Sequence, residues 1–327
     1  MSATGSGAQR PIVPPGLVLF VAVAAMSWAG PLVRLATAPA LVISAWRLIL
    51  SVAIIAGVLA VRGGAGVVRL SRREWGLAAA SGLLLALHLW SWIASLGLTS
   101  VASSVVLVNT HPILVASLSA LVLRERASTL QWVGIGIAVL GAAVIGWGDF
   151  HRGASPLLGD ALALAGAVFV SGYFIIGRTL RQRLDLWVYI GVVYGIAALT
   201  LALGVLVMPG AHLVGWPARD WLIFLALAAG PMMIGHTGVN YALRFVPAYV
   251  ANVTLLGEPV GSALIAWLLP QIRERPPVQT LVGGALILVG IALGVKRRGA
   301  ARAARRKPGP TAQSPADPAV PKPVGTR

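Results

Sequence analysis

The sequence lacks cysteine and carries little charge: none of its 327 residues is cysteine, and charged residues make up 11%. Without cysteine there is no disulfide framework, no thiol catalyst and no cysteine-bound metal. A soluble protein carries about 25% charged residues, whereas 57% of this chain is hydrophobic and its mean hydropathy is +0.85. These proportions predict an all-α membrane protein that crosses the bilayer many times.

Motifs for several function classes are also missing. The sequence has no phosphate-binding loop of the Gly-x-x-x-x-Gly-Lys-Ser/Thr type, so ATP is not expected to drive the protein. Its five histidines are scattered and do not have the spacing of a metal site. We therefore expect no cofactor, no metal and no enzymatic activity.

Positive charge is in excess, with a formal net charge of +17 at pH 7. Most basic residues lie in short loops or near the C-terminus, where the stretch from Lys296 to Lys307 holds seven of them. Such a stretch is expected to contact anionic membrane lipids, so a nucleic-acid partner is not needed to explain it. The oligomeric state is left open.

Long hydrophobic runs divide the chain into ten expected membrane spans. They fall near residues 15–33, 40–61, 76–97, 101–123, 130–148, 157–177, 186–208, 221–243, 247–269 and 278–295. The expected organisation is a disordered N-terminal tail at 1–14, a first half at 15–148, a second half at 157–295 and a basic, Pro/Ala-rich disordered tail at 296–327.

The basic residues favour one orientation of these spans. With both termini on the inner side, the inner segments hold 20 lysines and arginines and the outer loops hold 5, as the positive-inside rule requires. An arginine-rich composition with much alanine, glycine and valine indicates a bacterial source. We expect a multi-pass protein of the plasma (inner) membrane with cytoplasmic termini.

The second half repeats features of the first. Residues 124–141 and 273–290 both begin Arg-Glu-Arg and carry glycines ten and seventeen positions after the first arginine. Upstream of each stretch, His111 and Glu258 precede a proline in mid-span. Because five spans is an odd number, the two halves insert in opposite orientations, as in transporters whose site lies near the midplane between the repeats.

Glu258 lies within the nearly apolar run 251–270. A carboxylate at that depth costs on the order of several kcal/mol and usually marks a pathway or a binding site. Thr254 and Ser262 lie four residues to either side, which places three polar groups on one helix face, and Pro259 loosens the helix beside them. We interpret Glu258 as a substrate or proton site; the alternative is a buried glutamate paired with a neighbour for packing.

A set of motifs recurs in order through residues 15–296. They are Trp28-Ala29-Gly30, Ala45-Trp46-Arg47, Pro112, Glu125-Arg126, Gly134, Gly141, Glu258-Pro259, Glu274-Arg275, Gly283 and Gly290. On these positions the sequence resembles the EamA family of the drug/metabolite transporter superfamily. The resemblance implies ten transmembrane helices in two inverted five-helix repeats, a central cavity lined by both halves, and transport of small metabolites, often export of amino acids or related compounds. One departure is His111, which stands where the second half has Glu258.

Arg47 lies inside the second span, about 10 Å from the end of that span by the rise of a helix. Its functional interpretation is a clamp for an anionic or carboxylate group. The structural alternative is that the side chain reaches the membrane surface or pairs with backbone carbonyls. The sequence leaves both open.

Further candidates for the substrate or proton site lie in other spans. They are His111, His236, Asn240, His88, Trp92, Tyr173 and Trp28. His236 and Asn240 are spaced i, i+4 and suit a small amphipathic ligand. The alternatives are hydrogen bonding between helices for the polar residues and anchoring at the membrane interface for the aromatic ones.

Other positions are expected to belong to the scaffold. The spans at 130–148 and 278–295 have no charge at depth, so we expect them to pack through small residues, with each other as the candidate partner. The glycines expected at such contacts are Gly134, Gly141, Gly283 and Gly290. Glu125 and Glu274 sit beside arginines at span ends, which favours local ion pairs.

Together these features favour a secondary transporter that exports a small metabolite, an amino acid or a related amphipathic or cationic compound, by alternating access. Glu258 would bind a cationic group or carry a proton, and competition of proton and substrate for it would give antiport. The alternative is a membrane-embedded enzyme acting on a lipid-linked substrate, with Glu258 and a histidine as acid and base. That alternative predicts ionisable groups in sizeable loops at one membrane face, whereas the loops here are short.

Overall fold

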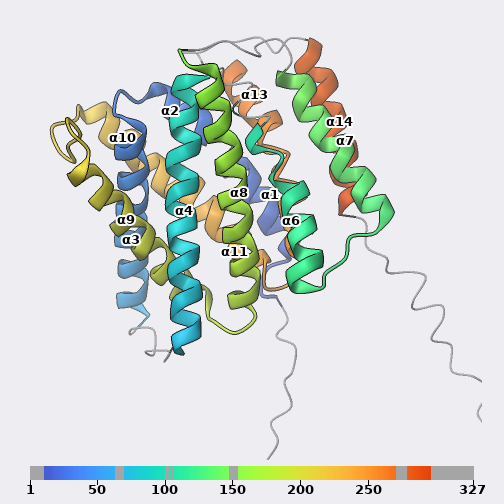
Figure 1. Ribbon diagram of the computed structural model, residues 1–327, viewed down its shortest axis with the longest axis horizontal. Helices are drawn as coiled ribbons and strands as arrows, with labels where there is room; N and C mark the ends of the chain where they lie inside the picture. The colour runs from blue at the N-terminus through green and yellow to red at the C-terminus, as the bar shows by residue number, and fades with distance from the viewer. Residues whose placement is uncertain are drawn as a thin grey trace, which may run out of the picture. The chain divides into compact units, whose positions relative to one another are not determined.

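The computed structural model describes residues 11–62, 70–99, 104, 107–146, 154–269 and 278–295. Within these ranges the chain forms helices and no strand (Figure 1), which confirms the all-α class for the described part. Several sequence predictions fall on other residues and lie outside these ranges: most of the N-terminal tail (1–10), Arg273, Glu274 and Arg275, and the C-terminal tail at 296–327.

The described chain consists mostly of helices. Their bounds are α1 Pro15–Met26, α2 Ala29–Leu35, α3 Ala40–Val61, α4 Arg72–Leu98, α6 His111–Leu118, η1 Ser119–Leu123, α7 Thr129–Gly146, α8 Pro156–Arg181, α9 Leu186–Val207, α10 Ala218–Leu227, η3 Ala228–His236, α11 Thr237–Ala242, α12 Ala248–Leu255, α13 Glu258–Leu268 and α14 Val278–Gly294. The elements η1 and η3 are π-helices.

Seven helical segments of the described chain are long and apolar enough to cross a membrane. They are Pro15–Leu35, Ala40–Val61, Arg72–Leu98, Pro156–Arg181, Leu186–Val207, Ala218–Ala242 and Ala248–Ile265, and three shorter apolar helices cover His111–Leu123, Thr129–Val144 and Leu281–Gly294. The protein is thus a multi-pass membrane protein. The count of ten spans and their inverted arrangement stay predictions.

Proline positions coincide with interruptions of the helices. Pro112 and Pro259 each occupy the first turn of a helix, α6 and α13, where the missing backbone N–H needs no partner. Pro231 lies inside the π-helix η3. A π-helical turn contains one residue more than an α-helical turn, and this extra residue can accommodate a proline within the helix. The segment expected as one continuous span around Glu258 is therefore two helices, α12 and α13, joined by the turn at Leu256 and Gly257.

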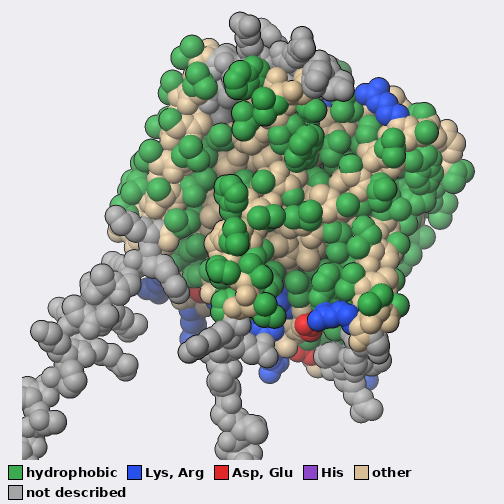
Figure 2. Space-filling model, turned by 180° about the vertical axis from the view of Figure 1, so that it is seen from behind, with side chains coloured by type: hydrophobic (Ala, Val, Ile, Leu, Met, Phe, Trp, Pro, Cys, Tyr) green, Lys and Arg blue, Asp and Glu red, His purple; other side chains and the backbone are tan. Residues whose placement is uncertain are grey.

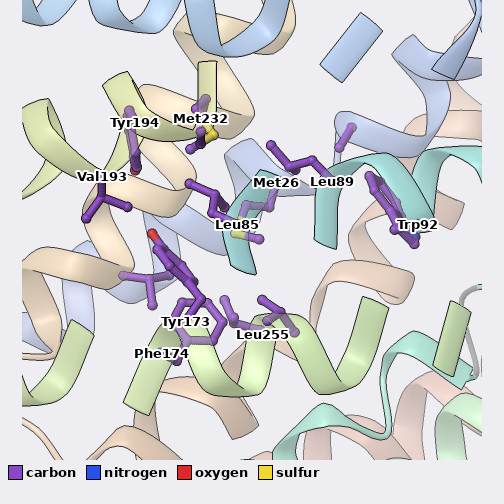
Figure 3. Packing of buried hydrophobic residues seen from close by; sticks show 14 of the residues in the cluster. Met26, Leu85, Leu89, Trp92, Tyr173, Phe174, Val193, Tyr194, Met232 and Leu255 are labelled. Atoms are coloured by element: carbon purple, nitrogen blue, oxygen red, sulfur yellow. The ribbon is translucent and has the colours of Figure 1, made fainter. Parts of the chain in front are cut away.

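The buried core lies between α4, α8, α9, η3 and α1. Side chains from these helices interleave, as Figure 3 shows for Leu85 of α4, Phe174 of α8, Met232 of η3 and Met26 of α1. In the same core α4 packs along α8 and α3 along α9. Because five helices close around one volume, polar side chains that point into it are removed from water and lipid alike.

Hydrophobic side chains dominate the molecular surface. In Figure 2 they cover most of the visible face, while lysine and arginine side chains gather along its lower edge. Large apolar residues are exposed on several helices, for example Phe20 at 72% and Leu206 at 71%. An exposed apolar surface bordered by cations is typical of a protein surrounded by lipid.

Candidate functional site

Polar and aromatic side chains from seven helical elements meet in the core. The buried polar cluster, as we call it, consists of Arg47 of α3, His88 and Trp92 of α4, His111 of α6, Tyr173 of α8, Tyr194 of α9, His236 of η3 and Asn240 of α11. Each of these residues is at most 8% exposed. Their convergence could not be read from the sequence, since the helices that supply them are far apart along the chain.

His236 is the aromatic centre of this cluster. Its ring centroid lies 6.3 Å from that of His88, 6.1 Å from that of Tyr173 and 6.4 Å from that of Phe174. The ring of His111 in turn lies 6.4 Å from that of Phe174. His236 lies in the last turn of the π-helix η3, and such elements are frequent at functional sites.

Hydrogen bonds fix the orientation of the tyrosines. The Asn240 Nδ2 donates to the Tyr173 hydroxyl at 2.5 Å and to the His236 carbonyl at 2.9 Å. The Tyr194 hydroxyl lies 3.2 Å from the Thr237 hydroxyl. Figure 3 shows the Tyr173 and Tyr194 side chains pointing toward each other. These bonds link α8, α9 and α11 around one polar centre.

Two histidines have their tautomers set by backbone carbonyls. The Nδ1 of His88 lies 2.9 Å from the Gly166 carbonyl oxygen, and the Nδ1 of His111 lies 3.0 Å from the Val108 carbonyl oxygen. A carbonyl oxygen only accepts, so each Nδ1 carries the proton, and the Nε2 of a neutral ring is then an acceptor. His88 and His111 therefore present Nε2 lone pairs.

Unpartnered polar atoms concentrate in this cluster. Of the eight buried side-chain N and O atoms without a hydrogen-bond partner in the described chain, six belong to it. These six are Nε and Nη1 of Arg47, Nε1 of Trp92, Nε2 of His111, Nδ1 of His236 and Oδ1 of Asn240. Buried polar groups are nearly always hydrogen-bonded, so this concentration makes the cluster the candidate functional site.

Arg47 neither reaches the membrane surface nor pairs with backbone carbonyls of the described chain through Nε or Nη1, which were the two structural alternatives for this residue. The side chain is 1% exposed and so does not reach the membrane surface. Its Nε and Nη1 find no carbonyl or other acceptor in the described chain. Its electrostatic partners are Glu258, Tyr194 and Tyr173, all of them near or in the cluster.

Glu258 lies at the start of α13 and is partly buried. It interacts electrostatically with Arg47, but no ion pair within 4 Å joins it to a cation of the described residues. The Glu258 carbonyl accepts a hydrogen bond from Ser27 Oγ at 3.4 Å, and Ser262 Oγ donates to the Ser27 carbonyl at 2.7 Å. The expected polar face with Thr254 is not one continuous helical stripe, because the turn between α12 and α13 interrupts it.

The structure brings seven of the nine candidates from the sequence into the buried polar cluster; Glu258 is not one of them but interacts electrostatically with Arg47. Trp28 is 42% exposed and so lies outside the buried polar cluster. Sequence reasoning missed Tyr194, which lies in the middle of the apolar helix α9. Its position away from a span end is the signal that could have distinguished it from an interface anchor.

Glu125 forms a long-range ion pair, which corrects the expectation of a local one. Its Oε1 accepts from Arg178 Nε at 2.8 Å, and its Oε2 accepts from the Ala248 backbone N–H at 3.2 Å. Arg178 also donates to the carbonyls of Leu243 and Arg244. The neighbouring arginines in sequence do not pair with Glu125, because the turn after η1 points its carboxylate at the end of α8.

Helices, apolar surface and buried polar cluster together define a multi-pass membrane protein of transporter type. A family model for the EamA-like transporter family matches residues 15–147 and again residues 157–295. The chain belongs to this family, which confirms the resemblance seen in the sequence. The family is one of transporters, so the chain is expected to bind a small-molecule substrate.

Relatives in other organisms carry names of the same kind. An uncharacterized transporter of Archaeoglobus fulgidus is 30% identical over 223 residues, 64% of this chain and 73% of that protein. The uncharacterized transporter YdfC of Bacillus subtilis is 29% identical over 57% of this chain and 59% of its own length. Protein RarD of Streptomyces exfoliatus is 26% identical over 54% of this chain and 59% of its own. The chain thus spans about three fifths of the last two.

A solved structure has the same fold. A chain described only as the crystal structure of a protein superposes with a TM-score of 0.72, covering 89% of this chain and 99% of that chain. The two sequences are 22% identical, so the likeness concerns the arrangement of helices.

Proposed function

We propose that the protein is a secondary transporter that exports a small metabolite by alternating access. Ten spans in two inverted five-helix repeats, with both termini in the cytoplasm of a bacterial cell, would carry it out in the inner membrane. The two successive family matches support two homologous halves. Rocking of one half against the other would expose a shared site to each side in turn.

One observation carries this proposal: unpartnered buried polar atoms from α3, α4, α6, η3 and α11 converge on one place. In a membrane protein such groups are costly to bury, which makes them functional by default. The first four spans contribute Arg47, Trp92 and His111, and the later ones contribute His236 and Asn240. A site built by both halves is what alternating access requires.

Glu258 is the proposed coupling residue. Its carboxylate interacts electrostatically with Arg47, so a proton on Glu258 weakens the attraction for that cation. A cationic group of the substrate and a proton would compete for this carboxylate, and that competition would give antiport. The interruption of the helix at Gly257 places this carboxylate at a point where the backbone can bend.

Transport by purified protein in proteoliposomes tests the role of Glu258. Amino acids, nucleosides, polyamines and cationic drugs are screened for ligand-induced thermal stabilisation, and a stabilising compound is used for uptake at several pH values. Glu258→Gln should abolish the pH dependence of uptake, because the amide cannot exchange a proton, while the protein remains folded. Unchanged uptake with an unchanged pH response would refute the role.

Glu74→Gln is the matched control. Glu74 closes a capping box with Ser71 at the start of α4, and glutamine serves that motif as well as glutamate does. The same charge is removed far from the buried polar cluster. Its uptake and pH response should match those of the unmodified protein.

A further inference from the structure

Four exposed arginines lie at the ends of three neighbouring helices. They are Arg62 directly after α3, Arg72 and Arg73 in the first turn of α4, and Arg183 in the connection between α8 and α9. The guanidinium carbon of Arg62 lies 5.8 Å from the ring centroid of Trp187 in α9, and Arg183 approaches Glu74 of α4 at 3.7 Å. We call these four residues the arginine corner.

Packing of the helices brings these arginines to one place. The short segment 183–187 leads into α9, and it contacts both Arg62 at the end of α3 and Glu74 at the start of α4. The three helices α3, α4 and α9 also pack against one another. Figure 1 shows the lower ends of α3 and α4 at the same edge of the bundle. The positive charges therefore form a single patch on the surface.

The carboxylates beside this patch are already engaged. The Oε2 of Glu74 accepts from the Ser71 backbone N–H at 2.9 Å and from the Ser71 hydroxyl at 2.8 Å. The Oδ1 of Asp185 accepts from the Trp187 backbone N–H at 2.9 Å. Water screens the one ion pair, since the Arg183 side chain is 78% exposed. Among the described residues the corner thus keeps an excess of positive charge.

Apolar side chains border the arginines. Val61, the last residue of α3, is 90% exposed, and Trp75 in the first turn of α4 is 50% exposed. Tryptophan is enriched at the boundary between membrane and water, where its ring lies at the level of the lipid headgroups. The guanidinium groups therefore lie beside a surface that suits acyl chains.

We propose that the arginine corner binds the phosphate of an anionic phospholipid, whose acyl chains lie along Val61 and Trp75. A guanidinium matches phosphate because its planar fork donates two parallel hydrogen bonds. The basic residues predict that this end of the bundle faces the cytoplasm, and the cytoplasmic leaflet carries anionic lipid. A soluble acidic partner would use the charge but would leave the apolar border uncovered. The site is separate from the buried polar cluster and from the basic stretch after Val295, and it does not depend on the transport proposal.

Three lipids that differ in headgroup charge test the proposal. Cardiolipin has two phosphates, phosphatidylglycerol has one, and in phosphatidylcholine an ammonium group balances the phosphate. Each lipid is titrated onto the purified full-length protein in detergent, and bound lipid is counted by native mass spectrometry. Both anionic lipids should bind about tenfold or more tightly than phosphatidylcholine. Similar affinities for all three lipids would overturn the proposal.

Paired substitutions assign the lipid to this corner. Arg72→Gln combined with Arg73→Gln should weaken cardiolipin binding about tenfold or more, because each arginine near a lipid headgroup contributes a factor of about five. Both side chains are exposed, and glutamine is a good helix former, so the fold should be kept. Arg62→Gln combined with Arg183→Gln should have the same effect. Undiminished binding in both double variants contradicts the site.

Arg124→Gln combined with Arg126→Gln is the matched control. These two arginines are also exposed, follow η1, and belong to the same expected cytoplasmic side. The control removes the same charge and should leave cardiolipin binding unchanged. The basic C-terminal stretch is present in every variant, so its contribution is constant. An equal loss in the control would show that net charge, and not the arginine corner, holds the lipid.

Glycerol 3-phosphate distinguishes a lipid from a free phosphate. It offers the same phosphate group without acyl chains, so it cannot cover Val61 and Trp75. At a concentration equal to that of cardiolipin it should not displace the lipid. Displacement at equal concentration would show that the corner binds free phosphate, and would overturn the phospholipid as its occupant.

Discussion

Gly134 of α7 and Gly290 of α14 approach so closely that a Cβ on either residue would lie within 2.7 Å of the carbonyl oxygen of the other. A second pair extends the contact, since a Cβ on Gly141 would lie 2.6 Å from the Gly283 carbonyl oxygen. The two helices run side by side in Figure 1. The prediction that these glycines pack the two spans against each other is confirmed.

Replacement of Gly134 by alanine is expected to destabilise the protein. The added methyl would press on the backbone of α14, which cannot yield as a flexible side chain can, and overpacking of this kind costs about 1–3 kcal/mol. The melting temperature of the purified variant in detergent measures the effect.

Gly136→Ala is the control for that substitution. Gly136 lies on the same helix, and a Cβ there would meet nothing within 4 Å. Alanine is the better helix former by up to about 1 kcal/mol, so this variant should be as stable as the unmodified protein or more so. Equal losses at Gly134 and Gly136 would show that the close approach is not what matters.

The pair of Glu125 and Arg178 should show a measurable coupling in a double-mutant cycle. Their side chains are only 20% and 16% exposed and their charged atoms lie 2.7 Å apart. Contacting residues of this kind couple by about 0.5–3 kcal/mol. Thermal unfolding of Glu125→Gln, of Arg178→Gln and of the double variant gives the value.

A second ion pair serves as reference for this cycle. Arg183 and Glu74 lie 3.7 Å apart, and the Arg183 side chain is 78% exposed. Exposed pairs contribute little because water screens them, so no coupling should be resolved there. A coupling as large as that of Glu125 and Arg178 would mean that burial does not strengthen the latter.

Asp220 should anchor the connection between α2 and α3. Its carboxylate is fully buried and accepts from the Thr37 hydroxyl at 2.7 Å and from the Ala38 backbone N–H at 3.0 Å. Asp220→Asn leaves an acceptor short and adds donors, which costs about 1–3 kcal/mol. A lower melting temperature is the expected result.

Asp185→Asn provides the comparison. Asp185 accepts from the Trp187 backbone N–H at the start of α9, and asparagine caps helices as well as aspartate does. Its melting temperature should stay close to that of the unmodified protein. If Asp220→Asn is equally harmless, the buried carboxylate does not hold the connection.

The sequence by itself determined the class of protein and its local features. Hydrophobic runs identify membrane helices because lipid forces each span to satisfy its own backbone. Spaced glycines identified the contact between α7 and α14, since only a residue without a side chain allows backbones to approach so closely. The repeated motifs led to the family, which two successive matches then established.

Only the tertiary structure decided which candidates belong together. It gathered Arg47, His236 and Asn240, left Trp28 outside, and gave Glu125 a partner in a distant helix. Whether Arg47 has its donors satisfied depends on carbonyls and side chains of several other helices, and no pattern within one span records them. The hydrophobic pattern of each segment determines its helix locally, whereas packing between distant helices determines which buried polar atoms of the described chain have no hydrogen-bond partner.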